Sequence, residues 1–166
     1  PPRSTLFPYT TLFRSGRPLR HLPSTTMTPP PTVVALSLAL GLGCDRGTPA
    51  TTIAQAIAEA LAACGGELAD VRAVASIDLK ADEAGLAAVA HANGWTIVFH
   101  PASELAAVEV PNPSETVRRH TGTPSVSEAA ALLAAGADSR HLLIEKHRLR
   151  GADGRNATVS IARIPA

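Results

Sequence analysis

Aromatic residues are scarce in this chain of 166 residues, which has three phenylalanines, one tyrosine and one tryptophan. Proteins that bind single-stranded nucleic acid stack the bases on aromatic side chains, so this composition argues against a nucleic-acid partner. Cysteine is also rare, and two cysteines do not suggest a disulfide framework, which favours a reducing, cytoplasmic compartment. The apolar runs are too short to span a bilayer, so no membrane partner is expected.

The chain does have enough apolar material for one compact domain, because 45% of its residues are hydrophobic and 17% are charged. Four arginines are the only charged residues before Met27, so the remainder is slightly acidic although the formal net charge is +1. Residues 5–15 resemble the translation of a sequencing-adapter oligonucleotide, which predicts that residues 1–26 are extraneous sequence or a disordered tail. Residues 27–32 are predicted to be a proline-rich lead-in, and residues 33–166 the domain.

The apolar run over residues 33–42 has two interpretations. Arginines precede it and Gly43-Cys44 follows it, as in the signal peptide of a lipoprotein. Three consecutive prolines before the run, and Gly41 where such signals usually carry leucine, favour a strand buried on both faces instead.

Strand and helix patterns alternate along the rest of the chain, and together they predict the fold class. Two successive βαβ units and a closing hairpin predict a three-layer α/β/α sandwich with a mostly parallel sheet and a C-terminal β-hairpin. Residues 101–124 are rich in proline and are predicted to be a long irregular loop with one short helix after Ser114. The predicted strands are residues 33–42, 71–77, 95–99, 142–149 and 157–164, and the predicted helices are residues 48–64, 82–93 and 125–136.

Two helix starts carry capping signals. Thr48 is predicted to cap the first helix, with Pro49 in its first turn. Ser125 and Glu128 have the spacing of a capping box, in which each side chain bonds the other residue's backbone amide.

A glycine-rich turn, GLGCDRG at residues 41–47, joins the first strand to the first helix. Free amides and the helix dipole attract anions there, and Arg46 adds a guanidinium. The spacing matches neither the dinucleotide-binding fingerprint nor a P-loop, so an anion site and a simple tight turn are equally favoured. Cys44 is interpreted as a small buried thiol rather than a reactive thiolate, because no histidine lies near it in the sequence.

Lysine is as rare as cysteine, with Lys80 and Lys146 as the only two. Lys80 follows the second strand, where ligands of α/β sheets gather, although a solvated cation between two aspartates explains it as well. Lys146 lies in an alternating polar pattern typical of an exposed strand face. The histidines lack the spacing of metal ligands, so neither a metal nor a cofactor is predicted.

An ordered series of sequence blocks comprises residues 41–47, 75–83, 85–86, 113–114, 122–130, 146 and 157–162. Together these blocks resemble the CobE family, which also forms the C-terminal domain of CbiG. The resemblance covers residues 33–164 and implies a compact α/β domain in cobalamin biosynthesis, most similar to the stand-alone members of the family. The family often has two adjacent basic residues in its first block, whereas Asp45 precedes Arg46 here.

The resemblance implies that the chain binds or delivers a precorrin or corrinoid intermediate through the carboxylates at the rim of that ligand. Two alternatives stay open: an enzyme that hydrolyses or rearranges a precorrin with Lys80 or Glu83 as acid or base, and an interaction partner of another pathway enzyme that uses residues 101–124. Neither the oligomeric state nor the intermediate is predicted. The expected ligand site comprises Gly41, Gly43, Cys44, Arg46, Gly47, Ser76, Lys80, Ser125 and Lys146.

Overall fold

The structure is a computed structural model that describes residues 34–166, of which residues 35–166 form one compact unit. The predictions for residues 1–26 and 27–32 lie outside the described residues. Within residues 34–166 no helix is long and apolar enough to cross a bilayer.

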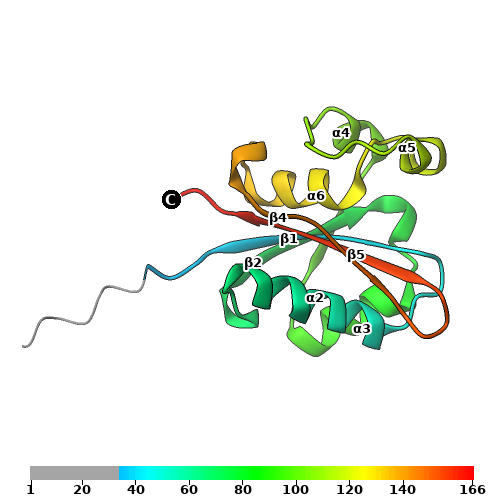
Figure 1. Cartoon of the computed structure of the whole chain (residues 1–166), viewed down its shortest axis with the longest axis horizontal. Coiled ribbons are helices and arrows are strands. Elements are labelled where there is room, and N and C mark those ends of the chain that lie inside the picture. Colours follow the sequence, from blue (N-terminus) through cyan, green and yellow to red (C-terminus); the bar gives the residue numbers. More distant parts are fainter. Residues whose placement is uncertain (1–33) are drawn as a thin grey trace, which may run out of the picture. The chain divides into compact units, whose positions relative to one another are not determined.

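A five-stranded sheet forms the centre of the domain, with strand order β3-β2-β1-β5-β4 (Figure 1). β1, β2 and β3 run parallel, whereas β5 runs antiparallel to both β1 and β4. The sheet is therefore mixed, with two parallel and two antiparallel pairings, so the expected description as mostly parallel holds only loosely. β4 and β5 form a hairpin, and the two strands of a hairpin always pair antiparallel. Because β5 lies between β4 and β1, it also forms an antiparallel pair with β1. The strands are Leu38–Cys44 (β1), Val71–Ile77 (β2), Ile97–His100 (β3), Leu142–Arg150 (β4) and Asn156–Arg163 (β5).

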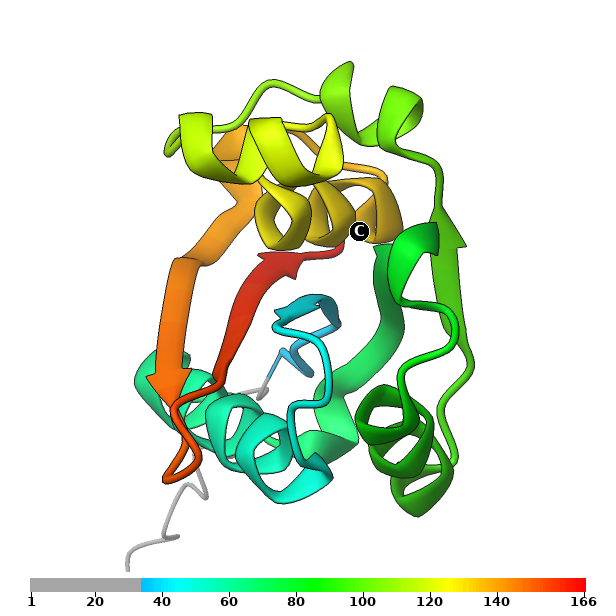
Figure 2. The same cartoon turned by 90° about the vertical axis from the view of Figure 1, so that its right-hand side faces the viewer.

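Helices cover both faces of the sheet, which confirms the three-layer architecture (Figures 1 and 2). On one face, α2 packs on β4 and β5 and contacts α3; on the other face, α6 packs on β1, β2 and β5. α4 contacts α6, and α4 and α5 lie on the same side of the sheet as α6. The helices are Ala50–Cys64 (α2), Ala84–Asn93 (α3), Ala102–Ala106 (α4), Glu115–Thr121 (α5) and Val126–Ala135 (α6), with short 3₁₀ turns Leu68–Asp70 (η1), Asp78–Lys80 (η2) and Ser139–His141 (η3).

The two faces of β1 carry side chains of different size. Leu38, Leu40 and Leu42 pack with α2 and α3, because alternate residues of a strand face the same side. Ala39 packs with the alanine-rich α6 on the other face. Gly41 also faces α6, and a Cβ atom there would overlap the backbone carbonyl of Ser127. Small residues on this face of β1 therefore allow α6 to approach the sheet closely.

Most elements begin and end within two residues of their predicted bounds, but two differences from the sequence prediction are larger. β1 begins at Leu38 rather than at residue 33, and it continues through both glycines to Cys44. The ends of β1 are set by its pairing with neighbouring strands, because Leu38 lies opposite Val71 and Cys44 lies opposite Ala157. The length of the apolar run does not set them. The segment predicted as an irregular loop contains α4 as well as the expected short helix, because Pro101 begins a helix there instead of breaking one.

Both predicted helix caps were wrong. α2 begins after Pro49 without a side-chain cap, and the Thr48 hydroxyl donates a hydrogen bond to the Asp45 carbonyl at 2.8 Å. At α6, Ser125 occupies the N-cap position, but its side chain bonds no backbone amide of the helix. Glu128 turns away from the helix start and accepts a hydrogen bond from the Asn112 side chain at 2.8 Å. At Thr48 a carbonyl of the preceding turn replaces the expected capping bond, and at Glu128 a side chain from the segment before α5 replaces it.

Candidate functional site

A pocket of about 330 Å³ opens where β1 and β2 end. Its lining comes from segments that are far apart in the sequence: the end of β1 and the turn after it, the end of β2 with η2, one side of α5, the first residues of α6, and the β4–β5 hairpin. Ligands of open α/β sheets commonly bind outside the carboxyl ends of the strands, which is where this pocket lies. The pocket is therefore the candidate functional site.

The structure brings six of the nine expected ligand-binding residues together at the pocket. Those six are Gly43, Cys44, Arg46, Lys80, Ser125 and Lys146. The other three, Gly41, Gly47 and Ser76, are not among the lining residues. Ser76 is fully buried and its hydroxyl donates to the Leu42 carbonyl at 2.7 Å, so it ties β2 to β1. Gly41 provides the close approach of α6 described above.

The donors of the glycine-rich turn are already bound within the protein. The Gly47 amide donates to the Glu83 carboxylate at 3.0 Å, and the Arg46 guanidinium donates to Asp82 at 2.8 Å and to the Leu79 carbonyl at 2.9 Å. The hydrogen bond from Arg46 lowers the pKa of Asp82, and the same bond raises the pKa of Arg46. Glu83, the candidate acid or base, is 6% exposed and lies outside the pocket lining. In this structure Glu83 stabilises the glycine-rich turn, because its carboxylate accepts the hydrogen bond from the Gly47 amide.

Asp45, the departure from the family pattern, has a structural role. Its carboxylate accepts hydrogen bonds from the Asn156 backbone amide at 2.8 Å and from the Asn156 side chain at 2.9 Å. These bonds join the end of β1 to the start of β5. One carboxylate oxygen of Asp45 is therefore bonded to the hairpin, while Asp45 also lines the pocket.

Cys44 contributes a neutral thiol to the pocket. Burial raises its pKa from 9.0 to about 11, although the positive charge of Lys80 opposes this shift. A thiol with such a pKa is protonated at neutral pH, and the thiolate is the form that attacks electrophiles or binds metals. The geometry thus supports the interpretation of Cys44 as a small apolar lining residue.

Lys80 reaches the pocket from η2, directly after β2. In the part of the chain that the structure describes, it forms neither a salt bridge nor a side-chain hydrogen bond. It is therefore a cation whose charge is available to a ligand.

Lys146 does not lie on an exposed strand face, because its side chain is only 18% exposed. The register of β4 against β5 shifts between Ile144 and His147, which adds one residue to β4 as a β-bulge. A bulge changes the direction of the side chains beside it, and Lys146 lines the pocket while its ammonium donates to the Asn112 carbonyl at 3.3 Å. The simple alternation seen in the sequence could not show this.

Sequence reasoning missed His120 and Arg148, which line the pocket, and also two polar residues next to its lining. Glu128 is fully buried, and its carboxylate lies 3.9 Å from the Lys146 ammonium. Asn112 donates to both Glu128, at 2.8 Å, and Glu145, at 2.7 Å. The capping-box pattern gave Glu128 a sufficient local explanation, and a lone asparagine between two prolines carries no recognisable signal.

Comparison with known proteins identifies the family. The family model described as cobalamin synthesis G C-terminus matches residues 38–162. The chain is 41% identical over 128 residues to a cobalt-precorrin-5A hydrolase from Priestia megaterium, covering 77% of this chain and 32% of the hydrolase. It is 38% identical over 117 residues to the protein CobE of a Sinorhizobium species, covering 69% of this chain and 75% of that protein. The chain thus spans about a third of the length of the hydrolase.

Solved structures agree with this assignment. The crystal structure of a CobE from the cobalamin pathway superposes with a TM-score of 0.69 at 33% identity, covering 82% of this chain and 99% of that one. The cobalamin biosynthesis protein chiG of Agrobacterium tumefaciens superposes with a TM-score of 0.56 at 35% identity, covering 78% of this chain and 99% of that one. The chain therefore belongs to the CbiG C-terminal family of cobalamin biosynthesis proteins, which includes CobE.

Proposed function

We propose that this chain binds or delivers a precorrin or corrinoid intermediate, holding the carboxylates at the rim of the ligand in the pocket at the ends of β1 and β2. One observation carries the proposal: the only two lysines of the chain, Lys80 and Lys146, line the same pocket although they lie in different elements. Ammonium groups in a partly desolvated pocket are suited to bind carboxylates. Membership of a cobalamin biosynthesis family supplies the class of ligand.

The size of the pocket favours partial rather than complete enclosure of the ligand. About 330 Å³ lies at the lower end of the range for drug-sized ligands, and a tetrapyrrole macrocycle is larger than such a ligand. One edge of the macrocycle with its carboxylates fits in the pocket, while the rest of the ring stays outside. A ligand held by its edge remains accessible to a second protein, which suits delivery.

The test is a spectrophotometric titration of the chain with hydrogenobyrinic acid, followed by gel filtration to see whether the colour elutes with the protein. We expect saturable binding of one ligand per chain. Lys80→Ala should raise the Kd about tenfold, which corresponds to the loss of one charge-assisted contact.

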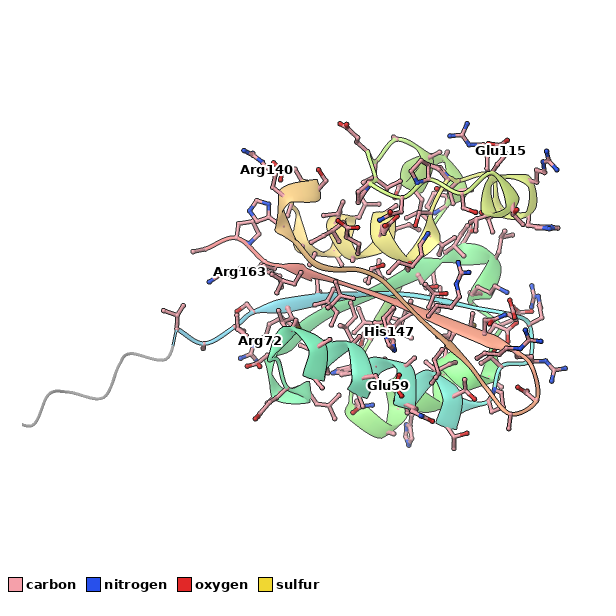
Figure 3. The ribbon with its side chains drawn as sticks, viewed as in Figure 1. Glu59, Arg72, Glu115, Arg140, His147 and Arg163 are labelled. Carbon is pink, nitrogen blue, oxygen red and sulfur yellow. The ribbon has the colours of Figure 1, made fainter. Side chains whose placement is uncertain are left out.

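Arg72→Ala is the matched control, because it also removes one positive charge. Arg72 lies where β2 begins, at the other end of the strand from η2, and Figure 3 shows it far from Glu115 on α5. Equal Kd values for the wild type and both variants would contradict the proposal. Colour that does not elute with the protein would favour a protein partner as the target instead.

A second candidate function is hydrolysis of a precorrin, which the 41% identity to a cobalt-precorrin-5A hydrolase favours. Because the chain spans only 32% of that protein, the residues that carry its activity need not lie in the shared part. A spectral change that continues with time and converts many equivalents of ligand would support hydrolysis. An immediate change that ends at one equivalent would support binding or delivery.

A further inference from the structure

The start of α6 carries donors that nothing in the described chain satisfies. Ser125 is 1% exposed and lines the pocket, and its hydroxyl has no hydrogen-bond partner among residues 34–166. The first amides of a helix have no acceptor within the helix, and the amides of Val126 and Ser127 donate no hydrogen bond to any other group among residues 34–166. All three residues line the pocket. A buried, unpartnered hydroxyl beside free amides indicates that the partner is a ligand.

The other helix start near the pocket differs in this respect. The Gly47 amide, in the turn before α2, already binds the Glu83 carboxylate at 3.0 Å. At α6 the carboxylate expected to cap the helix is Glu128, which binds Asn112 instead. A carboxylate of the protein therefore binds the amide in the turn before α2, whereas no carboxylate of the protein caps the start of α6.

Lys146 adds a positive charge on the same side of the pocket. Its ammonium has three donors, and the Asn112 carbonyl takes one of them at 3.3 Å. The buried carboxylate of Glu128 lies 3.9 Å from this ammonium and holds it in place by charge attraction. Donors of Lys146 therefore remain for a ligand beside the α6 amides.

We infer that the start of α6 is the seat for one carboxylate of the ligand, bound by the Ser125 hydroxyl, the Val126 and Ser127 amides and the Lys146 ammonium. Amides at a helix start and the helix dipole together favour an anion. This inference rests on the proposed function and specifies which part of the pocket selects the ligand. Lys80 then meets a different part of the carboxylate rim.

The amide of Val126 can be removed without breaking a helical hydrogen bond, because proline is well tolerated at the first position of a helix. Ser125, which precedes it, has the extended backbone that a following proline requires. Val126→Pro should therefore raise the Kd for hydrogenobyrinic acid at least about tenfold relative to Val126→Ala. Val126→Ala is the matched control, since it keeps the amide and also trims the buried side chain. Equal Kd values for two variants that both fold, as judged by circular dichroism, would overturn the inference.

A second measurement separates this inference from the proposed function. Acetate is titrated into the isotope-labelled wild-type chain while the amide resonances of Val126 and Ser127 are followed by NMR. Saturable shifts at these amides would support the seat even if no corrinoid binds, in which case only the proposed function fails. Shifts that do not saturate, or that inorganic phosphate produces at a lower concentration than acetate does, would overturn the carboxylate seat even if a corrinoid binds elsewhere in the pocket.

Discussion

The Glu128 carboxylate, fully buried in the first turn of α6, lies 3.9 Å from the Lys146 ammonium on β4. This pair joins α6 to the β4 bulge beneath the pocket, and Asn112 completes it by donating to Glu128 and accepting from Lys146. A buried carboxylate without its cation is costly, because water cannot solvate it. The pair therefore has a structural role in addition to any contact with a ligand.

Removing the cation of this pair should destabilise the fold. We expect Lys146→Met to lower the free energy of unfolding by about 2–4 kcal/mol, because it leaves the Glu128 carboxylate buried without its positive partner. Adding Glu128→Gln should recover part of this loss, since the uncompensated charge is then gone. Denaturant unfolding of both single variants and the double variant measures the coupling. Additive effects of the two substitutions would contradict the pairing.

Gly41 and Gly43 provide a matched comparison of packing. A Cβ atom at Gly41 would overlap backbone atoms of α6, whereas at Gly43 the nearest atom is the Thr158 Cβ at 3.8 Å, which is ordinary contact. We expect Gly41→Ala to destabilise the domain by about 1–3 kcal/mol or more, and Gly43→Ala by less than about 1 kcal/mol. Thermal unfolding of the two variants tests this difference. Similar melting temperatures would show that α6 does not depend on the close approach at Gly41.

Alkylation of Cys44 should report both its burial and the presence of a ligand. In a Cys64→Ser background, the reaction rate with iodoacetamide should rise with pH toward a midpoint near the Cys44 pKa of about 11. Lys80→Ala should slow the reaction further, because the charge of Lys80 lowers this pKa. Bound hydrogenobyrinic acid should block the alkylation of Cys44. Rapid alkylation at neutral pH would contradict a buried, protonated thiol.

The same pKa has a consequence for stability. Folding raises the pKa of Cys44 above its ordinary 9.0, so the folded chain holds this proton more tightly than the unfolded chain does. The stability that it contributes is complete below pH 9 and is lost as the pH rises through 9 toward 11. Cys44→Ala should weaken the fall of the free energy of unfolding over this interval. An unchanged slope in the variant would assign the pH dependence to other groups.

Arg46 should contribute less to ligand binding than Lys80, although both line the pocket. A ligand carboxylate must compete with Asp82 for the Arg46 guanidinium, because the two already lie 2.8 Å apart. We expect Arg46→Ala to raise the Kd less than about threefold and Lys80→Ala about tenfold. Asp82→Asn should tighten binding by releasing Arg46. A larger effect of Arg46→Ala than of Lys80→Ala would contradict this order.

The parts of the fold that the sequence predicted correctly depend on local patterns. β2 spans the predicted residues 71–77, and α2 and α3 end at the predicted residues 64 and 93, each directly before a glycine in the left-handed conformation. The hairpin about Gly154 also follows from local turn chemistry. The insertion of β5 beside β1 could not be predicted in this way, because it depends on pairing between segments that are distant in the sequence.

The candidate site shows the same division. Gly43, Cys44 and Lys80 come to the pocket because strand ends gather at one edge of a sheet, which the sequence pattern already implied. The position of Lys146 depends on a bulge, and the role of Glu128 depends on Asn112 from the segment before α5. Such long-range polar contacts replaced the capping box that local spacing favoured.

The most direct test of the proposed carboxylate site is the titration of the chain with hydrogenobyrinic acid, comparing the wild type with Lys80→Ala and the Arg72→Ala control. We predict saturable binding of one ligand per chain, weakened about tenfold by Lys80→Ala and unchanged by Arg72→Ala. Binding that is equal in all three proteins would show that the pocket at the ends of β1 and β2 is not where this chain holds its ligand.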